Sequence, residues 1–296
     1  MSSESPQSLF VGVVSHEGSR FSFNQSPHGL GGALGNVWQD LGFGRSTVQV
    51  NTKNLWSTQN VIRSPQRHDV QATLRAELQQ EKHWAQFLGT LNQRTRARLL
   101  LRRLSQIYKR VNSPSTDLVT RLLNIELSHL DLIKNALEYG SDWVLILEDD
   151  AHCADIQDLA RSIRVIQLTS DPPAFVNLTQ SHSLGALGIE HLLSPVSQLG
   201  WETPTTQTVL SAKKPFTNTV CAILYQREFL QALVTTLESL PVYPVLPIDW
   251  KLNVALMQLF NSGVIKENDC WTLDPGPIVQ LSMQPVSYVK EVQGNS

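Results

Sequence analysis

The chain of 296 residues is poor in the features that mark several specialised protein classes. It has three cysteines, Cys153, Cys221 and Cys270, which lie far apart and form no Cys-x-x-Cys pair. This pattern is neither a disulfide framework nor a zinc ribbon, and it is typical of a reducing compartment. The formal net charge is −2, so no overall positive charge indicates binding to nucleic acid.

Long hydrophobic runs are also missing. No apolar stretch approaches the roughly 20 residues that are needed to span a bilayer. The segment "MSSESPQSLF" has no basic region followed by an apolar one, so we expect no classical secretion signal. With 41% hydrophobic and 17% charged residues, the composition is that of a globular protein, and we expect it to be cytoplasmic.

Alternating strand and helix patterns predict an α/β fold. Residues 9–16 are rich in valine and predict a buried strand. Apolar residues then recur at helical spacing from Leu30 to Leu41, before Gly42 and Gly44, and "STVQVNT" predicts a second strand. This order indicates a βαβ unit and a mostly parallel central sheet flanked by helices. Further strands are expected at residues 173–180 and 219–225. With no low-complexity linker in the chain, we expect a single domain over residues 1–296.

Three consecutive carboxylates follow the most apolar predicted strand, in "SDWVLILEDDAHC". Glu148, Asp149 and Asp150 repel one another, which is costly unless a positive group meets them. Glu148 and Asp150 can hold one cation if the strand ends there, and ligands collect at the carboxyl ends of parallel strands. Carboxylate oxygens favour Mg²⁺ or Mn²⁺ over zinc, and a lone His152 is a weak zinc signal. The alternative is that the acids cap the next helix and face water.

The passage "LSHLDLIKNALEYGSDWVLILEDDA" resembles the central signature of glycosyltransferase family 25, the lipooligosaccharide-type glycosyltransferases. In that family a Leu-Ser-His-Leu helix precedes a hydrophobic strand that ends in Leu-Glu-Asp-Asp-Ala. Later segments follow the family's order: "NTVCAILYQREFLQAL", "LPIDWKLNVAL" and "LDPGPIVQLS". The first strand departs from the family pattern, with Arg20 as the best counterpart of its arginines. Cys221-Ala222-Ile223 replaces the small residue and tyrosine of the family.

The resemblance implies a GT-A-like nucleotide-diphospho-sugar transferase fold and an inverting, metal-dependent hexosyl transfer. The donor would be a nucleotide sugar, with a UDP-sugar favoured, and the acceptor a hydroxyl group on a glycan, a lipid-linked glycan or another molecule. Mn²⁺ or Mg²⁺ would bind Asp150 and Glu148, and Asp249 would be the catalytic base. The residues expected to contact the donor are Ser15, Arg20, Ser128, His129, Glu148, Asp149, Lys213 and Lys214.

Several of these residues have plainer interpretations. Asp249 lies near a predicted helix start, where the helix dipole alone favours an acid. His129 can be a core histidine with satisfied hydrogen bonds, and Lys213 and Lys214 can be solvated surface groups.

A basic segment lies within the predicted helical region of residues 69–111. From Arg94 to Arg110 the chain contains arginine and lysine but no acid. Such a helix suits anionic lipid at the inner membrane face, or a phosphate-bearing acceptor. The alternative is a solvated helix face over a core stripe.

Two other functions share these features. A Mg²⁺-dependent nucleotidyltransferase also uses an α/β sheet and acid-bound Mg²⁺, but "GLGGALG" is better interpreted as a helix with small faces than as a phosphate loop. A catalytically inactive member of the family would be a binding or scaffold protein that keeps the acids without turnover.

Overall fold

The structure is a computed structural model. It describes residues 7–16, 19–26, 28–52, 86–112, 116–179, 183–196, 208–217, 219–240 and 248–294. The expected helical region of residues 69–111 therefore lies partly outside the described residues.

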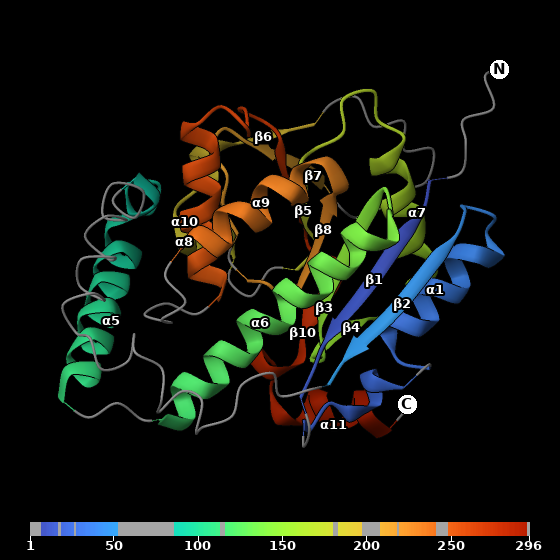
Figure 1. The fold of residues 1–296 in the computed structure, drawn as a ribbon, viewed down its shortest axis with the longest axis horizontal. Helices are drawn as coiled ribbons and strands as arrows, with labels where there is room; N and C mark the ends of the chain where they lie inside the picture. Colours follow the sequence, from blue (N-terminus) through green and yellow to red (C-terminus); the bar gives the residue numbers. More distant parts are fainter. Residues whose placement is uncertain are drawn as a thin grey trace.

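An eight-stranded sheet forms the centre of the protein, in the order β2-β1-β3-β8-β5-β9-β7-β6 (Figure 1). Its strands are β1 (Leu9–Val14), β2 (Ser46–Asn51), β3 (Trp143–Glu148), β5 (Phe175–Asn177), β6 (Leu193–Pro195), β7 (Thr208–Ala212), β8 (Ala222–Gln226) and β9 (Cys270–Asp274). The sheet is mixed but mostly parallel, because β7 and β8 run opposite to the other strands. A separate two-stranded sheet pairs β4 (Ala151–Cys153) with β10 (Ile278–Gln280).

Helices flank the central sheet, and short 3-10 turns join some of the elements. The α-helices are α1 (Leu30–Asp40), α5 (Gln93–Asn112), α6 (Thr116–Tyr139), α7 (Ile156–Gln167), α8 (Leu184–Leu187), α9 (Arg227–Ser239), α10 (Ile248–Asn261) and α11 (Val286–Gly294). The 3-10 turns are η1 (Ser22–Gln25), η2 (Glu190–Leu192) and η3 (Leu281–Met283). Among the described residues, none of the helices has the length and apolarity needed to cross a bilayer.

Strand β3 is buried on both faces, which explains its continuous apolar sequence. Val144 and Ile146 belong to a core cluster that includes residues of α6, α9 and α10. Trp143, Leu145 and Leu147 belong to a second cluster with residues of α1 and α7. Since side chains alternate along a strand, Glu148 follows Val144 and Ile146 onto the α6 side.

The predicted βαβ unit is confirmed. Strand β1 pairs in parallel with β2 on one side and with β3 on the other. Helix α1 connects β1 and β2, and it is followed by two glycines with positive φ, Gly42 at 69° and Gly44 at 132°. Glycine adopts this left-handed conformation without steric cost, so it ends the helix as predicted.

The strand expected at residues 219–225 begins three residues later, as β8. The preceding residues use their polar groups for local bonds instead of sheet pairing. The backbone N–H of Cys221 donates to Thr219 Oγ1 at 3.1 Å, and the Thr217 hydroxyl donates to the Thr219 carbonyl. Threonine hydroxyls compete in this way with regular backbone pairing, so this part of the prediction was wrong.

Candidate functional site

The three acids lie in a sharp turn at the carboxyl end of β3. Glu148 is the last residue of the strand, Asp149 and Asp150 form the turn, and β4 begins at Ala151. The buried Asn24 amide donates to the carbonyl oxygens of Asp149 and Ala151, each at 2.8 Å. The strand therefore ends where the sequence predicted, and Asn24 holds the turn in place.

The side chain of Asp149 is held by Ser15 and does not join the cluster that Glu148 and Asp150 form. Ser15, directly after β1, donates its hydroxyl to Asp149 Oδ2 at 2.6 Å. Gln25 Nε2 in turn donates to Ser15 Oγ at 2.5 Å. Because β1 and β3 are parallel neighbours, their carboxyl ends bring Ser15 and Asp149 together.

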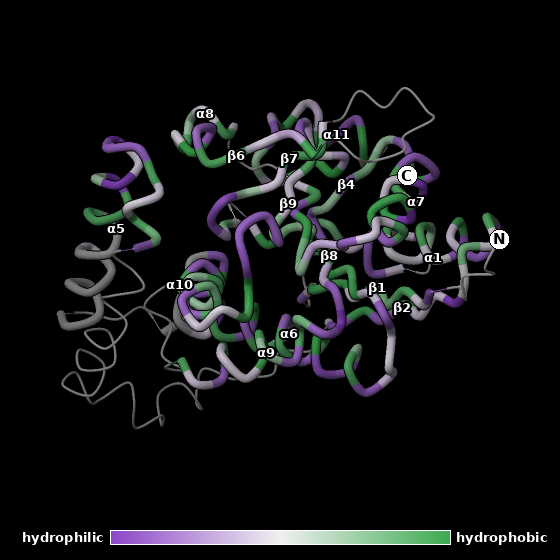
Figure 2. Tube along the Cα trace, turned by 90° about the horizontal axis from the view of Figure 1, so that it is seen from above, coloured by the Kyte–Doolittle hydropathy of each residue, from purple (hydrophilic) through white to green (hydrophobic). Residues whose placement is uncertain are grey.

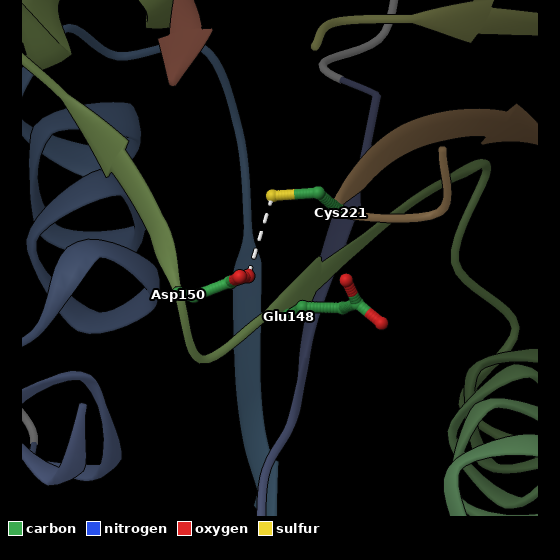
Figure 3. A group of neighbouring side chains, drawn as sticks. All are labelled: Glu148, Asp150 and Cys221. Atoms are coloured by element: carbon green, nitrogen blue, oxygen red, sulfur yellow. Dashed lines mark hydrogen bonds between the residues drawn. The ribbon is translucent and has the colours of Figure 1, made fainter. Parts of the chain in front are cut away.

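Glu148 and Asp150 form a cluster with a buried cysteine, Cys221 (Figure 3). One carboxylate oxygen from each acid and the Cys221 sulfur all lie within 4.8 Å of one another. The Cys221 thiol donates to Asp150 Oδ1 at 3.6 Å, and Figure 3 shows these two side chains pointing toward each other. Cys221 directly precedes β8, whose antiparallel pairing with β3 places it beside the end of that strand. These three side chains could hold a metal ion.

The site has unfavourable electrostatics without a cation. Burial raises the pKa of Asp150 to about 6, and the charge of Glu148 contributes in the same direction. Hydrogen bonds from Ser282 and Gln280 lower this pKa in part, while the charge of Asp149 raises it further. Burial also raises the pKa of the Cys221 thiol well above its usual value. A bound cation would reverse these effects, because a nearby positive charge favours carboxylate and thiolate.

The C-terminal part of the chain closes the site from another side. Gln280, at the end of β10, donates from Nε2 to Glu148 Oε2 at 3.4 Å and accepts from the Thr219 hydroxyl at 3.3 Å. The backbone N–H of Leu281 donates to the Asp150 carbonyl at 2.8 Å. The segment "DPGPIVQLS" thus contacts the acids directly.

Helix α6 contributes His129, a predicted donor-binding residue that lies beside Glu148. Its Nε2 is 3.7 Å from Glu148 Oε1, and the residue is 4% exposed. One turn earlier, Glu126 forms a buried ion pair with Lys251 of α10. Burial raises the pKa of Glu126, while the charge and hydrogen bond of Lys251 lower it. Ser128, also predicted, is buried on the same helix at 1% exposure.

The candidate base Asp249 lies in the first turn of α10. Lys251 links this helix to Glu126, and Asn253 links it to the segment before Cys221. Asn253 accepts from the Thr217 N–H at 2.9 Å and donates to the Thr217 carbonyl at 2.7 Å. The role of Asp249 as a base stays a prediction.

The basic residues that were predicted to contact the donor are exposed, and two of them lie away from the acids. Lys213 and Lys214 are exposed and follow β7, whose last residue pairs with the first residue of β9. They therefore follow the end of β7 that lies opposite to the strand end with the acids. The described residues show no ion pair between these lysines and the acid cluster. Arg20 is exposed in the loop after β1, with its guanidinium 4.7 Å from the centre of the Phe21 ring.

Of the residues singled out from the sequence, the structure brings together Ser15, His129 and the three acids. Sequence reasoning missed Asn24, Cys221 and Gln280. The only signal for Cys221 was its position inside a predicted strand, which becomes informative once the partner of that strand is known.

Comparison of the chain with models of protein families and with curated proteins gives no match. The functional assignment therefore depends on the residues and their geometry.

Proposed function

We propose that this protein is a metal-dependent, GT-A-like glycosyltransferase. It would transfer a sugar from a nucleotide-sugar donor, with a UDP-sugar favoured, to an acceptor hydroxyl by an inverting reaction. The observation that carries this proposal is the pair of carboxylates at the carboxyl end of β3. Asp150 is buried there, with 7% of its surface exposed, and it lies beside Glu148. Ligands of α/β sheets bind at such strand ends.

The metal ligands would be Asp150 and Glu148. A cation held there supplies Lewis-acid stabilisation, worth several kcal/mol, for the diphosphate that leaves the sugar. Burial, and then the charge of Glu148, raise the pKa of Asp150 to about 6, and a bound cation would offset both effects. The turn fixed by Asn24 keeps both carboxylates in position before a ligand arrives.

Ser15 and Asp149 would contact the donor. Asp149 Oδ2 accepts a hydrogen bond from the Ser15 hydroxyl. The other carboxylate oxygen of Asp149 can accept a hydrogen bond from a hydroxyl group of the ribose or the sugar. Positioning by such contacts lowers the barrier, since it removes the entropy cost of orienting the donor.

The acceptor hydroxyl needs a general base, which contributes about 10²–10⁴ in rate. Asp249 is the candidate, because buried contacts of Lys251 and Asn253 fix the start of α10 to Glu126 of α6 and to Thr217. An acid on a rigid helix next to the donor site can take the proton from the attacking hydroxyl.

One observation disfavours the nucleotidyltransferase alternative. In "GLGGALG" the glycines at 31 and 35 lie inside α1 and allow the helix to pack closely on the sheet. A Cβ atom at Gly31 would lie 2.8 Å from Val13 Cγ2, and one at Gly35 would lie 2.6 Å from Val48 Cγ2. These glycines are therefore explained by packing rather than by binding of a phosphate.

Nucleotide binding tests the proposal directly. We expect one of UDP, GDP and CMP to raise the thermal midpoint in the presence of a divalent cation, and EDTA to abolish the effect. A ligand at a hundred times its Kd adds about 2.7 kcal/mol to the free energy of unfolding. Asp150→Asn should lose the shift, while Asp171→Asn, at an exposed aspartate, should keep it. The absence of any nucleotide shift in the wild type with metal present would contradict the proposal and favour a scaffold.

A further inference from the structure

We propose that Cys221 is the third protein ligand of this site, and that the site takes a thiophilic cation such as Zn²⁺ in preference to Mg²⁺. This inference deepens the proposed function and rests on it for the role of the cation in catalysis. The metal ligation itself is argued from the site geometry and can be tested separately.

The distance between sulfur and oxygen fits zinc coordination. Cys221 Sγ and Asp150 Oδ1 are 3.6 Å apart. With Zn–S near 2.3 Å and Zn–O near 2.1 Å, two ligands at the tetrahedral angle lie about 3.6 Å from each other. The thiol proton now lies between these two atoms, and a cation would replace it there. On binding, the thiol proton leaves to solvent and the thiolate sulfur forms the bond to the metal.

His129 provides a second, independent observation. It is 4% exposed, and its Nε2 has no hydrogen-bond partner among the described residues although it lies 3.7 Å from Glu148 Oε1. Buried polar atoms almost always have a hydrogen-bond partner. A buried nitrogen without one beside this carboxylate therefore indicates a polar site whose hydrogen bonds form only when a ligand is bound. Carboxylates that bind metals are themselves held by hydrogen bonds. We infer that His129 holds Glu148 when Glu148 binds the cation.

The sulfur decides which cation is preferred. Two carboxylates alone would suit Mg²⁺ or Mn²⁺, as the sequence predicted, because these hard ions take oxygen ligands. A thiolate is a soft ligand that selects Zn²⁺ and similar ions. Three protein ligands leave a fourth position open, as in catalytic zinc sites, and a phosphate oxygen of the donor fits there.

The other two cysteines serve as internal controls. Cys153 is buried, and its thiol donates to the Asp155 carbonyl at 3.2 Å. Cys270 is buried in β9, where it pairs with Phe175 and Ala212. Neither belongs to the acid cluster in the described part of the chain.

Cobalt(II) is the appropriate probe, because a thiolate bound to it gives a charge-transfer band in the near ultraviolet. Titration of the purified full-length chain with Co²⁺ should produce this band, and Zn²⁺ should remove it while excess Mg²⁺ should not. Cys221→Ser should lack the band, whereas Cys153→Ser and Cys270→Ser should keep it. Far-UV circular dichroism checks that each variant is folded.

Two results would overturn the inference: Co²⁺ binding without the band in the wild type, or a band that persists in Cys221→Ser. X-ray absorption of the wild type with bound Zn²⁺ gives an answer even if the variant does not fold, since one sulfur at about 2.3 Å is expected. If nucleotide binding depends on metal but no sulfur is found, this inference fails and the proposed function stands. If the sulfur is found but no nucleotide binds, the glycosyltransferase proposal fails instead.

Discussion

Asp150 is buried beside two other carboxylates, so its ionised form is costly in the folded protein without metal. Its pKa in the folded state is about 6, compared with the usual 3.8. The folded state therefore binds the proton more tightly than the unfolded state. The free energy of unfolding falls as the pH rises from about 4 to 6, and the full cost is present above that range.

We therefore expect Asp150→Asn to stabilise the metal-free protein at pH 7.5. A shift of this size corresponds to a gain on the order of 3 kcal/mol, because one pKa unit is about 1.4 kcal/mol. Urea unfolding in EDTA measures the effect, which should disappear near pH 4. Asp171→Asn should change little at either pH. A variant less stable than the wild type at pH 7.5 would show that Asp150 serves mainly as a structural hydrogen-bond partner.

The sequence revealed the acids of this site but not its sulfur or its amides. Glu148, Asp149 and Asp150 are adjacent, so an apolar run that ends in three acids is visible without any structure. Cys221 is 71 residues from Asp150, and Gln280 is 132 residues from Glu148. Their contacts depend on the pairing of β3 with β8 and of β4 with β10, which no local pattern encodes.

At the scale of elements, strands and helices with a strong period were predictable. Strand β3 was recognised from its apolar run, and α1 from its helical spacing and its terminal glycines. The start of β8 was predicted too early, because the hydroxyl groups of Thr217 and Thr219 form local bonds. Lys213 and Lys214 lie at the opposite end of the strands from the acids because β7 is antiparallel to β9, and their sequence does not indicate this direction.

Helix α5 lies at the margin of the molecule, away from the central sheet (Figures 1 and 2). Its N-terminal half exposes Arg94 and Arg98, and Leu101 is 68% exposed nearby. The helix sequence contains no acid. Cations around an exposed leucine suit an anionic membrane surface, which attracts the charges and takes up the apolar side chain.

We therefore expect the protein to bind vesicles that contain phosphatidylglycerol but not vesicles of phosphatidylcholine alone. The variant Arg94→Gln/Arg98→Gln/Leu101→Gln should bind at least about 30-fold more weakly, since each basic residue near such a surface contributes about 1 kcal/mol. Arg161→Gln/Leu168→Gln, which removes one arginine and one leucine at exposed positions of the α7 region, is the control and should bind like the wild type. Co-sedimentation at low and high salt measures binding. Equal binding by both variants would contradict a membrane role for α5, and retention of RNA instead of vesicles would reassign the helix.

At the scale of the whole molecule, the central sheet joins segments from both ends of the chain. Strand β1 near the N-terminus lies beside β3, and β9 near the C-terminus lies beside β5 and β7. The two core clusters pack on opposite faces of this sheet, and both include side chains of its strands. Unfolding of the sheet would therefore disrupt both clusters. The single domain expected from the sequence stays a prediction, and this arrangement leads us to expect one cooperative unfolding transition.

Leu132→Ala tests this cooperativity. Leu132 of α6 is fully buried in the cluster on one face, whereas Trp38 and Trp143 are buried in the cluster on the other. Loss of a buried leucine side chain costs about 2–5 kcal/mol. If the sheet makes one unit, urea unfolding followed by far-UV circular dichroism and by tryptophan fluorescence should shift together by this amount. Leu168→Ala, at a residue 47% exposed, should shift neither probe appreciably. Separate transitions, or a fluorescence curve that does not move, would show that the two faces unfold independently, because only an intact sheet transmits the loss from one face to the other.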